Sequence, residues 1–123
     1  MLKIDFHEGF TASLLSGTIE YDGKVGVSYR VKGLGIEPKV GSFEVPKTYS
    51  SLYQNVVTHI DQFNDTYESN WDDLGGESLA IKTETIERAI EIKGPVEQSE
   101  LSQYELPLFE LKNFLRRELY NRV

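Results

Sequence analysis

The residues with the clearest chemical potential are six carboxylates within residues 61–77, a stretch that contains no lysine or arginine. Like charges at this density repel one another, so a folded protein spreads them or neutralises them with a partner. Carboxylates speed the encounter with a basic protein, and aromatic side chains anchor the complex. We therefore predict that this stretch binds a basic protein, with its two aromatic residues as anchors where they are exposed. The predicted contact residues are Asp61, Asp65, Tyr67, Glu68, Trp71, Asp72, Asp73 and Glu77.

A calcium loop is the alternative use of such carboxylates, and the spacing argues against it. An EF-hand loop needs a glycine at its sixth position and a glutamate at its twelfth. A loop that starts at Asp61 has Thr66 and Asp72 at these positions, and a loop that starts at Asp65 fails in the same way. The chain contains no cysteine, which excludes disulfides and thiolate metal sites. We expect no metal and no cofactor.

Catalytic motifs have little support in the sequence. The two histidines, His7 and His59, do not form a His-Glu-x-x-His zinc pattern, and neither a nucleophile elbow nor a phosphate-binding loop occurs. A Ser–His–acid triad stays open, because its members need not be neighbours in sequence. We expect no enzymatic activity, although a pocket that gathers either histidine with carboxylates would favour an enzyme or a small-ligand domain.

Length and charge limit the class of protein. The 123 residues suit one domain, and the net charge is −7. Residues 1–47 hold six acids and six bases, so residues 48–123 carry all of the excess. An acidic surface repels nucleic acid and anionic membranes, although solubility alone also explains such a charge. Neither a signal-peptide core nor an apolar run of membrane length occurs, so we expect a cytoplasmic protein.

The first third of the chain has the pattern of strands. Apolar residues alternate with polar ones over residues 2–6, and residues 10–15 form a second apolar stretch, expected to be extended. Asp22-Gly23 lies between two β-rich runs and predicts a two-residue hairpin turn. A glycine-rich loop and a short strand over residues 40–45 should follow.

Two helices are predicted from apolar residues at three- and four-residue spacing. The first should span about residues 50–66, which would place several acids at its C-terminal end. The second should span about residues 108–121, with three arginines in its last turns. The apolar stripes consist of Leu52, Val56, Val57, Ile60 and Phe63 in the first helix, and Leu108, Leu111, Phe114, Leu115 and Leu119 in the second.

The segment between the helices reads as further strands. Leu79 and Ile81 mark one, and residues 86–92 are assigned to another because β-branched residues dominate, although a helix also fits their spacing. Tyr104 to Leu106 suggest a last short strand, while Pro107 can also open a helix. The order of elements predicts a single α+β domain over residues 1–123, mainly an antiparallel β-sheet with two helices packed on it.

The second half of the chain, about residues 43–120, resembles a family of bacterial immunity proteins. The shared pattern is a helix followed by a tryptophan, two strands and a closing helix. Its residues are Trp71-Asp72-Asp73-Leu74, Ser78-Leu79-Ala80-Ile81, Ala89-Ile90-Glu91-Ile92-Lys93-Gly94 and the apolar stripe of the second helix. This pattern resembles the WapI-type family and related small β-rich immunity proteins of polymorphic-toxin and contact-dependent growth-inhibition systems. Where that family has an Asp-x-x-Gly turn between the two strands, this chain has Thr83-Glu84-Thr85.

The resemblance implies a cytosolic protein that binds one cognate toxin domain and blocks it without catalysis. Many such toxins are nucleases with basic surfaces, and an acidic protein can occupy such a surface in place of phosphates. The family does not fix individual contact residues. The alternative is a structural or assembly domain, such as a homo-oligomer, without a toxin partner; the sequence leaves the oligomeric state open.

Overall fold

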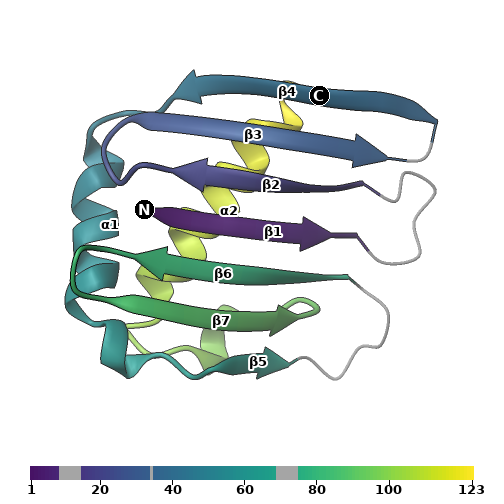
Figure 1. Cartoon of the computed structure of the whole chain (residues 1–123). Coiled ribbons are helices and arrows are strands. Elements are labelled where there is room, and N and C mark those ends of the chain that lie inside the picture. The colour runs from purple at the N-terminus through teal and green to yellow at the C-terminus, as the bar shows by residue number, and fades with distance from the viewer. Residues whose placement is uncertain (9–14, 34, 69–74) are drawn as a thin grey trace.

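The computed structural model describes residues 1–8, 15–33, 35–68 and 75–123 (Figure 1). Within them, seven strands form one sheet in the order β4-β3-β2-β1-β6-β7-β5. Every neighbouring pair is antiparallel except β5 and β7, which are parallel. The strands are β1 (Leu2–His7), β2 (Ser16–Tyr21), β3 (Gly26–Gly33), β4 (Ile36–Glu44), β5 (Thr66–Glu68), β6 (Gly76–Lys82) and β7 (Glu87–Lys93). The predicted α+β class, with a mainly antiparallel sheet, is confirmed.

Strand β1 lies in the middle of the sheet, and its alternating pattern explains its position. Leu2, Ile4 and Phe6 are buried on one face, as the period of two predicts. Leu2 pairs with Tyr21 of β2 on one side and with Ile81 of β6 on the other. The first strand therefore joins the two halves of the sheet.

The helices cover only one face of this sheet. Helix α2 (Leu106–Tyr120) runs behind the strands, and α1 (Thr48–Thr58) packs against it at one end (Figure 1). The rings of Tyr49 and Phe114 stack between the helices with centroids 3.8 Å apart. The predicted apolar stripe of the second helix is buried throughout, so the opposite face of the sheet is open to solvent.

The first helix is shorter than its apolar spacing predicts. It ends at Thr58 and is followed by a short 3₁₀ turn, η1 (Ile60–Gln62). Phe63 and Tyr67 then enter the core from extended chain, because β5 pairs with β7 instead of continuing the helix. The predicted helix 50–66 is therefore wrong at its C-terminal end, and the acids after residue 60 do not oppose a helix dipole.

The hairpin between β2 and β3 is confirmed, but its turn is longer than the predicted two residues. Residues 22–25 form the turn, and Asp22 Oδ1 accepts the N–H groups of Lys24 at 2.7 Å and Gly26 at 3.1 Å. This side chain replaces backbone partners that a tighter turn would supply.

Two further boundaries differ from the sequence prediction. Strand β4 begins at Ile36 and includes Pro38, which an edge strand tolerates because one side of its backbone faces solvent. The segment from Tyr104 to Leu106 is not a strand. It follows a second 3₁₀ turn, η2 (Gln98–Glu100), and leads into α2, where Pro107 occupies the first turn. The expected stretch 10–14 lies outside the described residues.

The turn glycine Gly23 allows a test of this packing. Gly23 and Gly35 both have positive φ, but a Cβ at Gly23 would lie 2.7 Å from Tyr53 Cε2, whereas one at Gly35 meets nothing within 4 Å. We expect Gly35→Ala to lower the free energy of unfolding by about 1 kcal/mol, and Gly23→Ala to lower it by about 1–3 kcal/mol more. Urea titrations measure the free energy of unfolding of both variants. Equal losses would show that the Tyr53 ring moves aside without a loss of stability.

Candidate functional site

The structure separates the eight predicted contact residues into three groups. Trp71, Asp72 and Asp73 lie outside the described residues. Two members are buried, and the remaining three are exposed on η1, on β5 and between them. The exposed members are Asp61, Asp65 and Glu68.

Two of the exposed acids already have partners within the chain. Asp65 forms an ion pair with Arg88 at 2.8 Å, and Glu68 lies 3.4 Å from the ammonium of Lys93. Both bases come from β7, because the parallel pairing of β5 places Glu68 opposite Lys93. The base-free run in the sequence is therefore neutralised in part by a neighbouring strand, although exposed pairs of this kind contribute little to stability.

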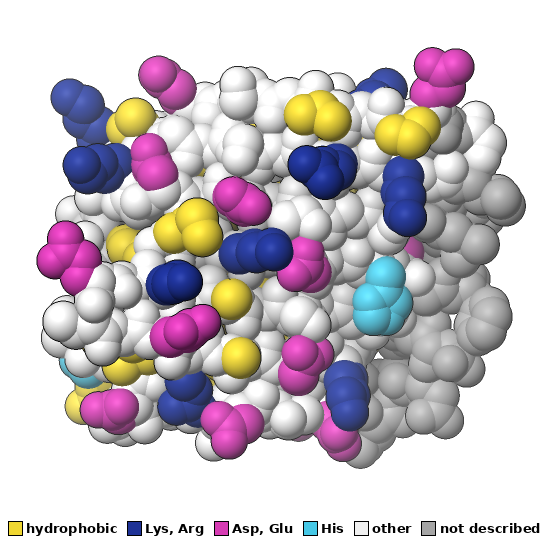
Figure 2. Space-filling model, viewed as in Figure 1, with side chains coloured by type: hydrophobic (Ala, Val, Ile, Leu, Met, Phe, Trp, Pro, Cys, Tyr) yellow, Lys and Arg dark blue, Asp and Glu magenta, His cyan; other side chains and the backbone are white. Residues whose placement is uncertain are grey.

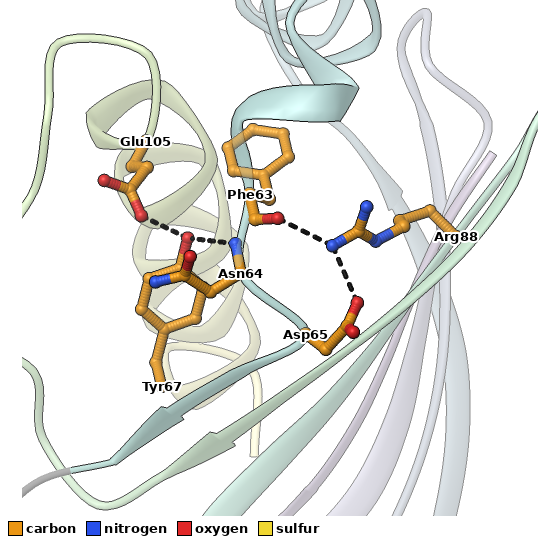
Figure 3. Close-up of polar contacts among 6 residues, drawn as sticks. All are labelled: Phe63, Asn64, Asp65, Tyr67, Arg88 and Glu105. Atoms are coloured by element: carbon orange, nitrogen blue, oxygen red, sulfur yellow. Dashed lines mark hydrogen bonds and ion pairs between the residues drawn. The ribbon is translucent and has the colours of Figure 1, made fainter.

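Tyr67 is a core residue, so it does not serve as an exposed anchor. It is 6% exposed, and its ring lies edge-on to that of Phe109. Its hydroxyl accepts the backbone N–H of Asn64 at 3.0 Å and donates to the Glu105 carboxylate (Figure 3). Arg88 reaches the same linker and donates to the carbonyl oxygen of Phe63 at 2.6 Å. These bonds tie β5 to β7 and to the start of α2.

The Tyr67–Glu105 pair has shifted protonation equilibria. Burial, followed by the hydrogen bond to Glu105, raises the pKa of Tyr67 to about 12. Burial alone would raise the pKa of Glu105. The hydrogen bonds from Tyr67 and Ser102 outweigh that effect, so this pKa lies below its usual value. At neutral pH the pair is thus a phenol that donates to a carboxylate.

Glu77 is also buried, contrary to its predicted place on a binding surface. It is 6% exposed, and its Oε1 accepts a hydrogen bond at 2.9 Å from Lys112, which is 7% exposed. Its Oε2 lies 3.3 Å from Arg116 Nη1. The sequence did contain a signal for this placement. Glu77 shares the inward period of Leu79 and Ile81, and both bases lie on the inner side of α2.

The buried Glu77 lies at the edge of a pocket of about 400 Å³ at one end of the sheet. His7, Glu8 and Asn113 line this pocket together with Glu77 and its two bases. Tyr120 donates to Glu8 at 2.8 Å and accepts from Arg116, which extends the polar network. A pocket that gathers His7 with carboxylates is the arrangement that would favour an enzyme. Here both oxygens of the Glu77 carboxylate are already paired within the protein, Oε1 with Lys112 and Oε2 with Arg116.

The acidic character of the chain extends beyond the predicted run. Residues 61–105 contain twelve Asp and Glu against three Lys and Arg, a net charge of −9, and the rest of the chain carries +2. The described residues of this range, 61–68 and 75–105, include β5, β6 and β7, which form one half of the sheet (Figure 1). The open face in view carries basic and acidic side chains interspersed (Figure 2).

Six exposed carboxylates in this half have no ion pair within the described part of the chain. One of them, Glu91 on β7, accepts a hydrogen bond from Ser78 of β6 at 2.9 Å. We call the other five the acidic end. They lie on η1, on and after the β6–β7 turn, and on the segment that contains η2. The ring contact of His59 with Tyr104, at 4.8 Å, brings the η2–α2 segment beside the end of α1. The acidic end consists of Asp61, Glu84, Glu87, Glu97 and Glu100.

Sequence reasoning found only Asp61 among these five. The other four were missed because they are spaced along the sequence and do not cluster. A running charge balance over 45 residues, instead of a search for a dense run, would have found the acidic half. In the described ranges no group of three or more His, Asp or Glu side chains is placed to hold a metal ion.

Comparison of the sequence with protein-family models and with curated proteins finds no match. The resemblance to immunity proteins therefore depends on the sequence pattern alone. The structure adds to it the distribution of acidic side chains over the surface.

The Tyr67 network predicts a pH-dependent effect of mutation. Tyr67→Phe leaves the Asn64 N–H and the Glu105 carboxylate without this partner, so we expect a loss of about 1–3 kcal/mol near neutral pH. Because the folded pKa of Glu105 lies below its usual value of 4.5, its contribution is present above that value and lost as pH falls through the folded pKa. Urea titrations should show a difference between wild type and variant that shrinks below about pH 4. A difference that stays constant on acidification would contradict this assignment.

The buried ion pair between Glu77 and Lys112 predicts a larger loss of stability on mutation than the Tyr67 network does. Glu77→Gln leaves Lys112 and Arg116 without their buried counter-charge, and we expect it to lower the free energy of unfolding by about 3 kcal/mol or more. Glu68→Gln, which disrupts an exposed pair, is the matched control and should cost less than about 1 kcal/mol. Chemical denaturation measures both. Similar small losses would show that the Glu77 pair contributes no more than a surface pair.

Proposed function

We propose that this chain is an immunity protein that binds a cognate toxin domain with a basic surface and neutralises it without catalysis. The observation that carries the proposal is the separation of charge, with −9 in the half formed by residues 61–105 and +2 in the rest. A net charge alone would serve solubility, whereas a charge concentrated on one half also orients an oppositely charged partner toward that half.

The physical role of the acidic half is to attract and orient the partner. Charges of one sign on one side raise the rate of encounter with an oppositely charged surface and disfavour wrong orientations. A nuclease domain has a surface that binds phosphates, and exposed carboxylates can occupy it in their place. The toxin is thereby blocked by binding alone.

The ion pairs within the chain determine which carboxylates attract a basic partner most strongly. Asp65 and Glu68 each have a base beside them, so their fields are weaker than a count of charges suggests. None of the carboxylates of the acidic end forms an ion pair within the described ranges, although Lys82 lies opposite Glu87 across β6 and β7. We place the main contact at the acidic end. Trp71, Asp72 and Asp73 remain predicted contacts.

The proposal also includes location and chemistry. We place the protein in the cytoplasm, where it would meet a toxin that has entered the cell, and we assign it no cofactor. No helix in the described ranges is long and apolar enough to cross a membrane.

Capture of the partner is the direct test. The tagged protein is incubated with an extract of its own cells at low salt, and proteins that elute at high salt are identified by mass spectrometry. We expect one basic protein in stoichiometric amount. The isolated toxin domain of that protein should lose its activity when one equivalent of this chain is added. If the captured protein keeps its activity at saturation, the immunity function is wrong.

Two matched triple variants test the surface. Asp61→Lys, Glu84→Lys and Glu100→Lys together alter the acidic end, whereas Glu20→Lys, Glu37→Lys and Glu110→Lys alter exposed acids elsewhere. Both raise the net charge by the same amount, so only the position differs. We expect the first triple to slow association with the captured protein about tenfold or more at low salt, with a weaker dependence on salt, and the second to have a small effect. Equal effects would place the contact outside the acidic end.

A further inference from the structure

The two edges of the sheet differ in a way that points to a second interaction. At the edge beside the acidic half, β5 has only three residues. At the opposite edge, β4 has nine, and one of its backbone sides has no neighbouring strand in the described part of the chain. Long free edges pair readily with another strand, so proteins usually shorten them or protect them with proline and charge.

One hydrogen bond shows which backbone groups of β4 face outward. The N–H of Val45 donates to the carbonyl oxygen of Val25 at 2.9 Å, so odd-numbered residues of this segment bond to β3. Within residues 39–45, the even-numbered residues therefore direct their N–H and C=O groups to solvent. Pro38 lies just before them, where the register shifts because Val31 pairs with Lys39 but Gly33 pairs with Ile36. A bulge of this kind at an edge strand accepts a residue without an N–H.

Protection of this edge covers only its ends. Pro38 and Lys39 protect the first half of β4, and Pro46 lies two residues beyond its end. Between the two prolines, residues 40–44 contain only one charged residue, the terminal Glu44. Val40 is 75% exposed, although it is apolar and lies in the middle of the strand.

We propose that two copies of this chain associate by antiparallel pairing of β4 with β4, about a two-fold axis at Ser42. Pro38 and Pro46 are each four residues from Ser42, so this register sets each proline opposite the other proline of the second copy. Val40, Ser42 and Glu44 then form the hydrogen-bonded pairs between the two copies. None of these residues is a proline, so each has an N–H group to donate. A register centred on Val40 would instead place Pro38 opposite the N–H and C=O of Ser42, where the ring cannot donate.

The side chains on the open face are complementary in the same register. On the inner face, Gly41 lies opposite Phe43 of the second copy, and the Tyr29 ring of its own chain already covers this glycine. Val40 lies opposite Glu44 of the second copy on the open face, and Arg30 is its neighbour on β3. Each Val40 is then flanked by a basic and an acidic side chain that can bridge over it and remove it from water.

The proposed pairing is independent of toxin binding. Strands β4 and β5 are at opposite edges of the sheet, so association through β4 leaves the acidic half exposed on both copies (Figure 1). It can therefore be tested with the purified protein alone, and its failure would not affect the proposed function.

The first experiment measures self-association by sedimentation velocity over a concentration series. Ser42→Pro removes the central outward N–H, which makes no bond within the monomer, and Ser42→Ala removes the hydroxyl but keeps that N–H. We expect a dimer for wild type and for Ser42→Ala. For Ser42→Pro the dissociation constant should rise about tenfold or more, because two hydrogen bonds across the axis are lost. Val40→Lys, with circular dichroism to confirm folding, is the second disruptive variant.

The second experiment determines the register through single cysteines, which is possible because the chain has none of its own. In the proposed dimer the two Ser42 residues face each other with Cα atoms about 5.5 Å apart, within disulfide range. The two Val40 residues are offset by four positions, about 14 Å along the strand. Under mild oxidation Ser42→Cys should form a cross-linked dimer, and Val40→Cys should not.

The outcomes separate clearly. A wild-type protein that stays monomeric at every concentration overturns the proposal, as does a dimer that Ser42→Pro and Val40→Lys leave unchanged. Cross-linking through Val40→Cys in place of Ser42→Cys overturns the register. A strand of a different protein on this edge would leave the purified chain monomeric, and so also counts against the pairing of two copies.

Discussion

The burial of one sheet face under α2 is the interaction on which the other features depend. Leu108, Leu111, Leu115 and Leu119 are fully buried against strands whose inward residues alternate with exposed ones. Because a single layer of helices covers a single face, the inward positions of the central strands are mostly apolar and the outward positions mostly polar. The uncovered face and both sheet edges remain available for contact with other molecules, and the two halves of the chain differ in charge.

The parts of the fold that the sequence could predict are those set by local periodicity. The central strand and the second helix each combine a clear period with a suitable length. The strand at residues 87–93 was predicted from its β-branched residues, because its spacing also fits a helix. The parts that it could not predict depend on distant residues. Strand β5 has three residues and exists because β7, more than twenty residues later, pairs with it. Without this partner, the spacing of Ile60 and Phe63 reads as a continued helix.

The same distinction explains the outcome for the site. Tyr67 and Glu77 belong to an acidic run in the sequence, but burial was decided by their strand positions and by partners on α2. The three-dimensional arrangement also redistributes charge, because Arg88 and Lys93 on β7 meet acids whose sequence neighbourhood contains no base. A dense cluster of carboxylates in sequence is thus a weak guide to which carboxylates are exposed and unpaired in the folded protein.

The position of β1 also has a consequence for the order of folding. One of its edges pairs with the adjacent β2, but the other must await β6, whose Ile81 pairs with Leu2. During synthesis on the ribosome, the first four strands can form a meander whose edge at β1 stays open until most of the chain has emerged. Helix α2, the cover of the apolar face, comes later still. Pairings over such sequence separations slow folding, so the sheet and its cover are completed only after nearly the whole chain is available.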